Sequence, residues 1–205
     1  MMTLILGGSG SGKSEYAEGY LLAHSHNLEK YYIATMQVYD EEGQRKVERH
    51  RRLRAGKGFQ TIEQSASIEL AGKAIQADSK KTSVREKKLT SRKAVALLEC
   101  LSNLVANEMF STPELPKEEH IAEQIIQGIQ KLHRQVEHLV IVSNNVFEDG
   151  IAYDPTTLAY MRVIGKIHQQ LVEEAEEVIE VVVGLPIFWK KHELRNSSME
   201  TGREP

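Results

Sequence analysis

Short apolar runs recur along the chain, each rich in β-branched or aliphatic residues and each too short to favour a helix. They cover Met2–Leu6, Tyr31–Thr35, Ala94–Leu98, Leu139–Ser143 and Val178–Val183. Longer segments with helical spacing of apolar residues lie between them, namely Lys13–Ala23, Asp40–Leu53, Ser65–Ala77, Leu101–Phe110, Lys117–Val136 and Thr156–Ala175. This alternation predicts an α/β fold, a mostly parallel sheet with helices on both faces.

The size of the chain allows either one large domain or two small ones. It has 205 residues, of which 40% are hydrophobic, and a net charge of −3. We expect a single domain over residues 1–192. Within it, residues 78–93 carry seven Lys or Arg against two acidic residues and have little apolar content, which predicts a solvated excursion from the fold. Residues 193–205 are polar and are predicted to form a disordered tail.

Neither a membrane segment nor a secretion signal is readable. The apolar stretches Val178–Val183 and Leu185–Trp189 fall well short of the roughly 18–20 residues that a membrane span needs. The first apolar run lacks a preceding basic region, so we expect no signal peptide. Cys100 is the only cysteine and cannot form an intrachain disulfide. We therefore expect a cytoplasmic protein that does not bind membranes.

The most specific motif follows the first predicted strand and opens the first predicted helix. Its residues are Gly7, Gly8, Ser9, Gly10, Ser11, Gly12, Lys13 and Ser14, which match the phosphate-binding pattern G-x-x-x-x-G-K-[ST]. Glycines let backbone N–H groups turn toward phosphates, and the helix N-terminus adds partial positive charge. Lys13 would bind the β- and γ-phosphates, and the Ser14 hydroxyl would ligate Mg²⁺. The motif predicts a P-loop fold that binds ATP or GTP with Mg²⁺.

A carboxylate is expected at the end of another strand, because open α/β sheets bind ligands at the carboxyl ends of their strands. Glu99 directly follows the apolar run Ala94–Leu98. Strands often end in a charged residue, so this position alone is ambiguous. Its coincidence with the phosphate loop favours a role at the nucleotide.

A basic segment follows the second predicted strand. Residues 45–57 hold seven Lys or Arg and one Glu, and the start of the segment should lie at the same sheet edge as the phosphate loop. If it is helical, His50 and Arg54 share a face. A neutral imidazole could attack phosphorus while arginines stabilise the charge on the phosphoryl oxygens. A merely solvated histidine and a nucleic-acid patch are the alternatives. The segment lacks the aromatic residues that single-strand binders interleave, so we expect no nucleic-acid partner.

Several motifs together resemble a known family. LGGSGSGKSEYAE and YYIAT are followed by H-x-x-x-R, here His50 to Arg54, and by an aromatic-x-T-x-E motif, here Phe59 to Glu63. LLECLSNLVANEMF, with Asn107, and VIVSNNVFEDGIAYDP resemble two further family segments. The whole chain thereby resembles the bifunctional adenosylcobinamide kinase / adenosylcobinamide-phosphate guanylyltransferase family of cobalamin biosynthesis.

The resemblance implies two reactions: phosphorylation of adenosylcobinamide by ATP or GTP, then transfer of GMP to the resulting phosphate through a guanylyl-histidine. It implies that His50 is the nucleophile, with Lys13 as the second catalytic residue. The implied nucleotide contacts beyond the phosphate loop are Ala34, Thr35, Met36, Arg51, Arg52, Leu53, Arg54, Glu63 and Glu99. It also implies a homo-oligomer, a trimer.

The chain departs from the family pattern mainly in its C-terminal third. Asn145 and Phe147 stand where the family has Glu and Gly, and His168 stands where it has Asn. Met161 and Arg162 stand where the family has an Arg-Asp pair. These changes concern the corrinoid side more than nucleotide binding. They leave open a nucleotide-binding paralogue that has lost transfer activity. A generic P-loop small-molecule kinase would explain the loop, but neither His50 nor Glu63.

Overall fold

A computed structural model describes residues 1–38, 41–85, 93–112, 116–147 and 150–191. Its strands are β1 (Met2–Gly7), β2 (Glu29–Ala34), β3 (Phe59–Glu63), β4 (Ala94–Glu99), β5 (His138–Asn144), β6 (Glu177–Val182) and β7 (Leu185–Lys190). Its helices are α1 (Lys13–Ala23), α2 (Glu41–Arg54), α3 (Glu69–Arg85), α4 (Leu101–Met109), α5 (Glu118–His133) and α6 (Pro155–Glu174).

The strands form one seven-stranded sheet in the order β3-β2-β4-β5-β1-β6-β7. All neighbouring strands are parallel except β6 and β7, which form an antiparallel pair. The predicted α/β architecture with a mostly parallel sheet is therefore confirmed. Because β1, β2, β4 and β5 are parallel, their carboxyl ends meet at one edge, where the phosphate loop, the start of α2 and Glu99 are found.

The sequence pattern missed β3 and β7, the two strands at the edges of the sheet. Neither is a continuous buried run: β3 has two half-buried and three exposed residues, and every residue of β7 is exposed. Pro186 in β7 is tolerated because an edge strand has an unpaired side. The pattern of apolar residues therefore predicts the buried central strands but not these two edge strands.

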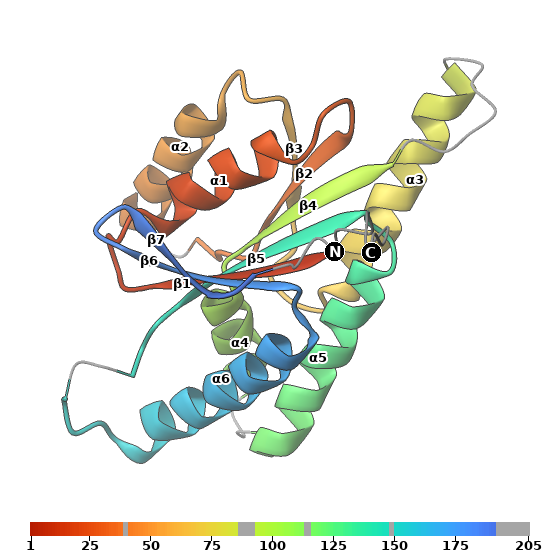
Figure 1. The fold of residues 1–205 in the computed structure, drawn as a ribbon. Coiled ribbons are helices and arrows are strands. Elements are labelled where there is room, and N and C mark those ends of the chain that lie inside the picture. The colour runs from red at the N-terminus through yellow and green to blue at the C-terminus, as the bar shows by residue number, and fades with distance from the viewer. Residues whose placement is uncertain (39–40, 86–92, 113–115, 148–149, 192–205) are drawn as a thin grey trace, which may run out of the picture.

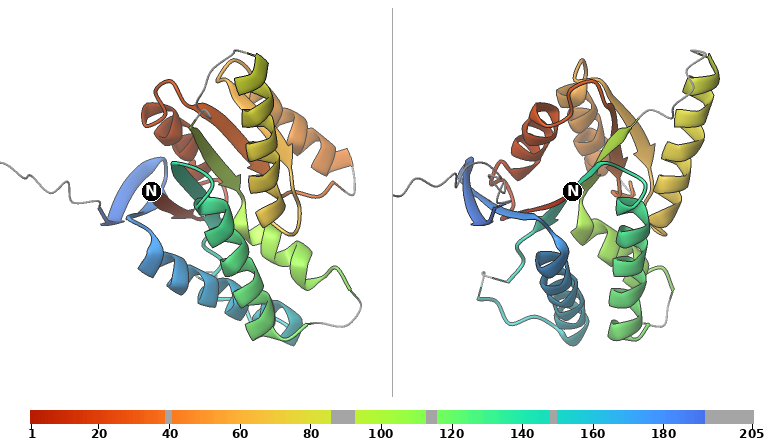
Figure 2. Two further views of the ribbon diagram at one scale, coloured as in Figure 1. Left: turned by 90° about the vertical axis from the view of Figure 1, so that its right-hand side faces the viewer. Right: turned by 45° about the vertical axis from the view of Figure 1, so that its right-hand side comes forward.

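Helices cover both faces of the sheet and divide the core in two (Figure 1). On the face of α1 and α2, Ala17 and Leu21 pack against the strand residues Ile5 and Val142. On the opposite face, residues of α3 to α6 pack with Leu4 and others. Leu4 and Ile5 point to opposite faces, as successive strand residues do. Figure 2 shows the two helical layers from the side.

The bounds of two helices follow from local sequence. Helix α6 begins at Pro155, preceded by Asp154, whose carboxylate accepts hydrogen bonds from the N–H groups of Thr156 and Thr157 at 2.8 and 3.1 Å. Asp and Pro are favoured at these positions. Helix α3 runs to Arg85, beyond the predicted end at Ala77. Residues 78–85 contain neither Gly nor Pro, so nothing stops the helix there.

The rest of the predicted excursion, residues 86–92, and the predicted tail lie outside the described residues. In the described part of the chain, no helix is both long and apolar enough to cross a membrane.

Candidate active site

The phosphate loop joins β1 to α1, the context that its motif requires. Gly10 and Gly12 have positive φ angles of 73° and 88°, which only glycine adopts readily. Helix α1 begins at Lys13, and the Lys13 Nζ donates a hydrogen bond to the Gly8 carbonyl at 3.0 Å. The loop therefore curls around its own lysine at the N-terminus of a helix, as a phosphate site requires.

The first residue of α1, Lys13, and the last residue of β4, Glu99, bring opposite charges to this loop. The Ser14 hydroxyl donates a hydrogen bond to Glu99 at the end of β4, so the carboxylate predicted from its position lies at the loop. Burial lowers the pKa of Lys13, while the charge of Glu99 opposes that shift. Burial raises the pKa of the Cys100 thiol. The site thus combines a partly desolvated ammonium with a carboxylate.

Ser14 and Glu99 fit a magnesium ion that arrives with a nucleotide. Both offer oxygen ligands, which Mg²⁺ prefers, and Mg²⁺ is commonly held by few protein groups together with phosphates and water. Their direct contact shows that both groups reach one point beside the loop. Among the described residues, no cluster of three or more His, Cys, Asp or Glu side chains is arranged to hold a metal ion alone.

A cleft with a volume of about 870 Å³ opens between α2 and the ends of β2 and β3. Of the predicted nucleotide contacts, it is lined by Ala34, Met36, Arg51 and Glu63. The Arg51 guanidinium forms an ion pair with the Glu63 carboxylate across it. These residues come from the end of β2, from α2 and from β3, and the fold brings the three elements together at one cleft.

Arg54 lines a smaller adjoining cavity of about 90 Å³ with Glu99 and Cys100. Only 7% of Arg54 is exposed, and its guanidinium carbon lies 3.4 Å from the centre of the Tyr32 ring. Its buried Nη1 has no hydrogen-bond partner in the described structure. A buried, unpartnered guanidinium nitrogen costs free energy unless an acceptor arrives, so this group is suited to an anionic ligand.

Other predicted residues are placed elsewhere or are not described. The Thr35 hydroxyl donates to the Cys100 carbonyl and accepts from the Cys100 N–H, both at 2.8 Å, so it is buried in a structural contact. Arg52 is exposed and pairs with Glu48. His50 and Leu53 belong to α2, but their side chains lie outside the described part of the structure.

Asn107, in the segment LLECLSNLVANEMF, holds together two segments at the cleft. Its side-chain amide donates to the carbonyls of Thr35 and Ser65, each at 2.8 Å. Because these carbonyls follow β2 and β3, one amide ties together the two segments that flank the cleft. Asn107 is thus a positioning residue for the cleft.

The turn between β6 and β7 was not anticipated as part of the site. The Gly184 N–H donates to the Ser11 carbonyl at 2.8 Å, and a Cβ on Gly12 would lie 3.4 Å from the Gly184 Cα. The turn therefore packs directly on the phosphate loop. The sequence does contain a signal for this turn: Val183 and Gly184 separate two apolar runs, and two-residue hairpin turns favour glycine.

Two positions that depart from the family pattern contact each other. The Phe147 and His168 rings lie 6.0 Å apart between centroids, edge to face. His168 is buried, and its Nε2 lies 2.8 Å from the Ser143 hydroxyl. Burial lowers the pKa of His168 to about 4, so its imidazole is neutral near pH 7. His168 is therefore a packed structural residue.

Comparison with known proteins identifies the fold and the family of the chain. In solved structures, the fold is similar to that of an ATPase domain, with a TM-score of 0.52 at 14% identity, covering 94% of this chain and 77% of that one. Among curated proteins, the chain is 29% identical over 196 residues to the bifunctional adenosylcobalamin biosynthesis protein CobU of Escherichia coli, covering 91% of this chain and 98% of that one. It is 28% identical over 188 residues to the corresponding protein CobP of Pseudomonas aeruginosa, covering 91% and 96%. The family model described as cobinamide kinase / cobinamide phosphate guanyltransferase matches residues 3–188. The chain belongs to this cobinamide kinase / cobinamide phosphate guanyltransferase family.

Proposed function

We propose that this protein phosphorylates adenosylcobinamide with ATP or GTP and then transfers GMP from GTP to adenosylcobinamide phosphate, giving adenosylcobinamide-GDP. The second reaction passes through a guanylyl intermediate on His50. The observation that carries the proposal is the meeting, at one sheet edge, of a complete phosphate loop and a cleft lined by Arg51 and Glu63.

The phosphate loop supports the kinase step. Lys13 is held at the N-terminus of α1 and would stabilise the β- and γ-phosphates of the donor. The contact between Ser14 and Glu99 supports a Mg²⁺ site at the same point. When bound, Mg²⁺ would neutralise charge on the phosphate oxygens and orient them.

Helix α2 supports the guanylyl transfer. Val47 and Arg54 both line the smaller cavity, and helical spacing puts position 50 on the face that these two positions share. The unpartnered Nη1 of Arg54 and the cleft-lining Arg51 are suited to the oxygens of the transferred phosphoryl group.

The guanylyl transfer consists of two displacements at the α-phosphorus of GTP. A neutral His50 nitrogen attacks the α-phosphorus of GTP, a P–N bond forms, and pyrophosphate leaves with the electrons of the broken P–O bond. A phosphate oxygen of adenosylcobinamide phosphate then attacks the same phosphorus, and the P–N bond breaks to return the histidine. Imidazole suits both roles because it is largely neutral near pH 7.

The homotrimer and the cytoplasmic location stay predictions from the sequence. Sedimentation of the purified protein would measure the oligomeric state. No function that we propose depends on either.

Corrinoid turnover tests the proposal. Purified protein is incubated with Mg²⁺, GTP and adenosylcobinamide, and the corrinoid products are separated and identified by mass. We expect adenosylcobinamide phosphate first and adenosylcobinamide-GDP later, and neither with Lys13→Ala. Nucleotide binding without either corrinoid product would contradict the proposal and favour a paralogue that has lost transfer activity.

A further inference from the structure

A further cavity lies away from the phosphate loop, between the start of α5 and residues 158–169 of α6. Its volume is about 490 Å³. Its lining comprises two residues of α5, one of the segment after β5, and one face of α6: Glu118, Glu119, Phe147, Leu158, Met161, Arg162, Gly165, Lys166 and Gln169. We call this cavity the α5–α6 groove.

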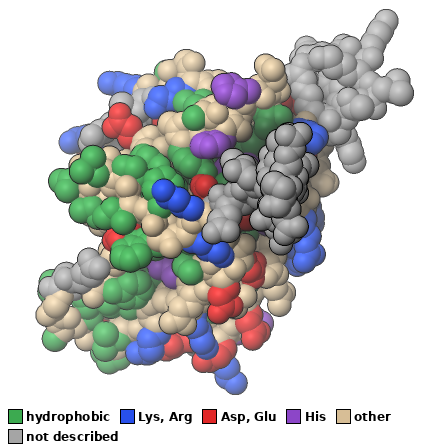
Figure 3. Space-filling view, viewed as in Figure 1, with side chains coloured by type: hydrophobic (Ala, Val, Ile, Leu, Met, Phe, Trp, Pro, Cys, Tyr) green, Lys and Arg blue, Asp and Glu red, His purple; other side chains and the backbone are tan. Residues whose placement is uncertain are grey.

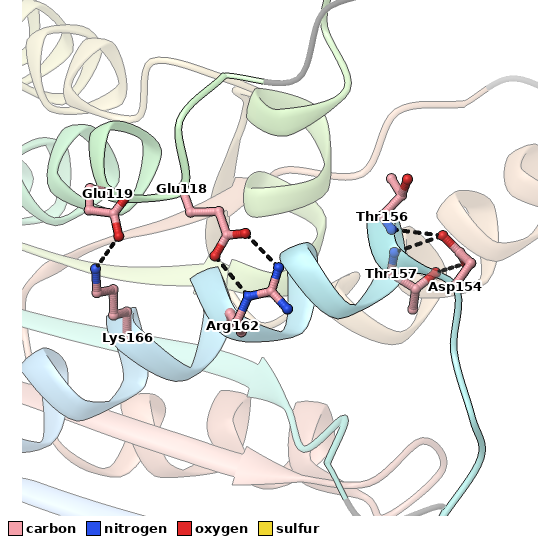
Figure 4. Close-up of polar contacts among 7 residues, drawn as sticks. All are labelled: Glu118, Glu119, Asp154, Thr156, Thr157, Arg162 and Lys166. Atoms are coloured by element: carbon pink, nitrogen blue, oxygen red, sulfur yellow. Dashed lines mark hydrogen bonds and ion pairs between the residues drawn. The ribbon is translucent and has the colours of Figure 1, made fainter.

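The charges at the α5–α6 groove neutralise one another in pairs (Figure 4). Arg162 donates from Nε and Nη2 to the two carboxylate oxygens of Glu118, at 3.0 and 2.6 Å. The Lys166 Nζ lies 3.0 Å from Glu119 Oε1. Each cation therefore has its own carboxylate from the facing helix. A groove whose charges are paired in this way is poorly suited to a nucleotide polyphosphate and better suited to a ligand with apolar and amide groups.

Apolar side chains gather at the same end of α6. Phe147 is 45% exposed and Leu158 is 40% exposed, and Ile151 in the preceding segment is 61% exposed. Figure 3 shows hydrophobic side chains over this end of α6, beside the charged side chains of α5 and α6. A Cβ at Gly165 would lie 3.7 Å from the Phe147 ring, so the absence of a side chain there keeps the groove open beside the aromatic ring.

The backbone connects the α5–α6 groove to the phosphate loop. The Asn145 N–H donates to the Gly7 carbonyl at 3.0 Å, and two residues later Phe147 lines the groove. Because α5 precedes β5 and α6 follows it, the N-terminal ends of both helices lie toward the carboxyl edge of the sheet. The groove and the phosphate loop therefore open toward the same edge, on different sides of the segment after β5.

We infer that the α5–α6 groove binds the macrocycle of the corrinoid acceptor, while the nucleotide occupies the phosphate loop and the cleft of α2. This rests on the proposed function. A corrinoid is a large ring with apolar faces and neutral amide side chains, which suits Leu158, Met161 and the Phe147 ring, with the Gln169 amide and the paired charges as hydrogen-bonding groups. One groove serves both reactions, because both modify the same side chain of the ring.

The test compares two arginine substitutions on one helix. Leu158→Arg puts an unpaired cation into the groove, and Val172→Arg puts the same charge at a similarly exposed position of α6, 38% exposed and outside the groove. Cobinamide binding is measured by equilibrium dialysis, and the KM for the corrinoid is measured in both reactions. For Leu158→Arg we expect at least tenfold weaker binding and at least tenfold higher KM in both reactions, with Val172→Arg within twofold of the unaltered protein.

A further readout separates the groove from the nucleotide chemistry. Covalent attachment of GMP from GTP needs no corrinoid, so Leu158→Arg should leave it unchanged. Gly165→Leu provides a second variant that fills the groove and suits a helix; it should also raise the KM for the corrinoid. Thermal unfolding checks that each variant is folded.

The outcomes are distinguishable. Unchanged cobinamide binding in folded Leu158→Arg and Gly165→Leu would overturn the groove assignment and leave the proposed function standing. An unaltered protein that neither binds nor modifies cobinamide would overturn both. A change of oligomeric state in Leu158→Arg, without weaker cobinamide binding, would show that the groove is an interface between copies and overturn the assignment.

Discussion

The guanidinium of Arg54 lies over the ring of Tyr32, with its carbon 3.4 Å from the ring centre. The contact joins the last residue of α2 to the middle of β2, and it holds an arginine that is 7% exposed against the sheet. Stacking on an aromatic face orients a guanidinium without using its N–H groups. Arg54 is therefore fixed in place with donors still available for a ligand.

Replacing Arg54 should weaken GTP binding more than replacing another arginine of α2. Arg54→Ala removes charge-assisted hydrogen bonds, which we expect to cost about tenfold or more in affinity. Arg45→Ala is the matched control, because Arg45 is exposed and pairs with Glu41 on its own helix. Isothermal titration with GTP measures both. Equal affinities for the two variants would contradict a nucleotide contact by Arg54.

Replacing Ser14 should change the dependence of the kinase step on Mg²⁺. Ser14→Ala removes the hydroxyl that contacts Glu99, so we expect about tenfold more Mg²⁺ to be needed for half-maximal rate. Ser14→Thr keeps a hydroxyl and should restore most of the lost affinity. The measurement is a Mg²⁺ titration at saturating nucleotide. An identical Mg²⁺ dependence in Ser14→Ala would rule out this assignment.

A methyl group at Gly7 should destabilise the protein, whereas one at Gly8 should not. A Cβ on Gly7 would lie 2.5 Å from the Ser11 Oγ and 2.7 Å from the Val181 carbonyl oxygen, while one on Gly8 meets nothing within 4 Å. We expect Gly7→Ala to lose about 1–3 kcal/mol of unfolding free energy and Gly8→Ala to stay within about 0.5 kcal/mol. Urea unfolding compares them. Equal stabilities would show that β6 is not packed on the loop.

These contacts indicate what the sequence could and could not predict. Buried strands such as β1 and β4 are continuous apolar runs, so their positions followed from periodicity. The phosphate loop was predictable because its chemistry demands particular residues at fixed spacing. Glu99 was predictable only in combination with the loop, since a charged residue ends many strands.

Other features depend on contacts between distant residues and leave no local pattern. The edge strand β3 is largely exposed, so the pattern of its residues does not indicate a strand. The hydrogen bond from Gly184 to Ser11 and the stacking of Arg54 on Tyr32 join elements whose proximity only the sheet order reveals. The predicted end of helix α3 was too early. The charged residues after Ala77 indicated exposure to solvent, but an exposed segment can also be the last turns of a helix.

Acid should destabilise the protein in part through His168. Burial lowers its pKa to about 4 from the ordinary value of 6.5, so the unfolded chain binds more protons between these values. The contribution of His168 to stability is therefore complete above pH 6.5 and is lost as the pH falls toward about 4. Its size is on the order of 3 kcal/mol.

His168→Gln should reduce this pH dependence. The difference in unfolding free energy between about pH 7.5 and about pH 4 is measured by urea unfolding, and it should be smaller in the variant by a few kcal/mol. His120→Gln, at an exposed position of α5, is the matched control. A His168→Gln protein with the same pH dependence as the unaltered protein would contradict the assignment.

The most direct test of the account is whether His50 becomes covalently guanylylated. Unaltered protein and His50→Ala are incubated with Mg²⁺ and GTP labelled at the α-phosphate, without corrinoid, and the denatured protein is assayed for label that acid releases. We expect acid-labile label on the unaltered protein and none on His50→Ala, while His50→Ala keeps most of its cobinamide kinase activity. Absence of label on protein that measurably binds GTP, or equal loss of both activities in His50→Ala, would contradict it.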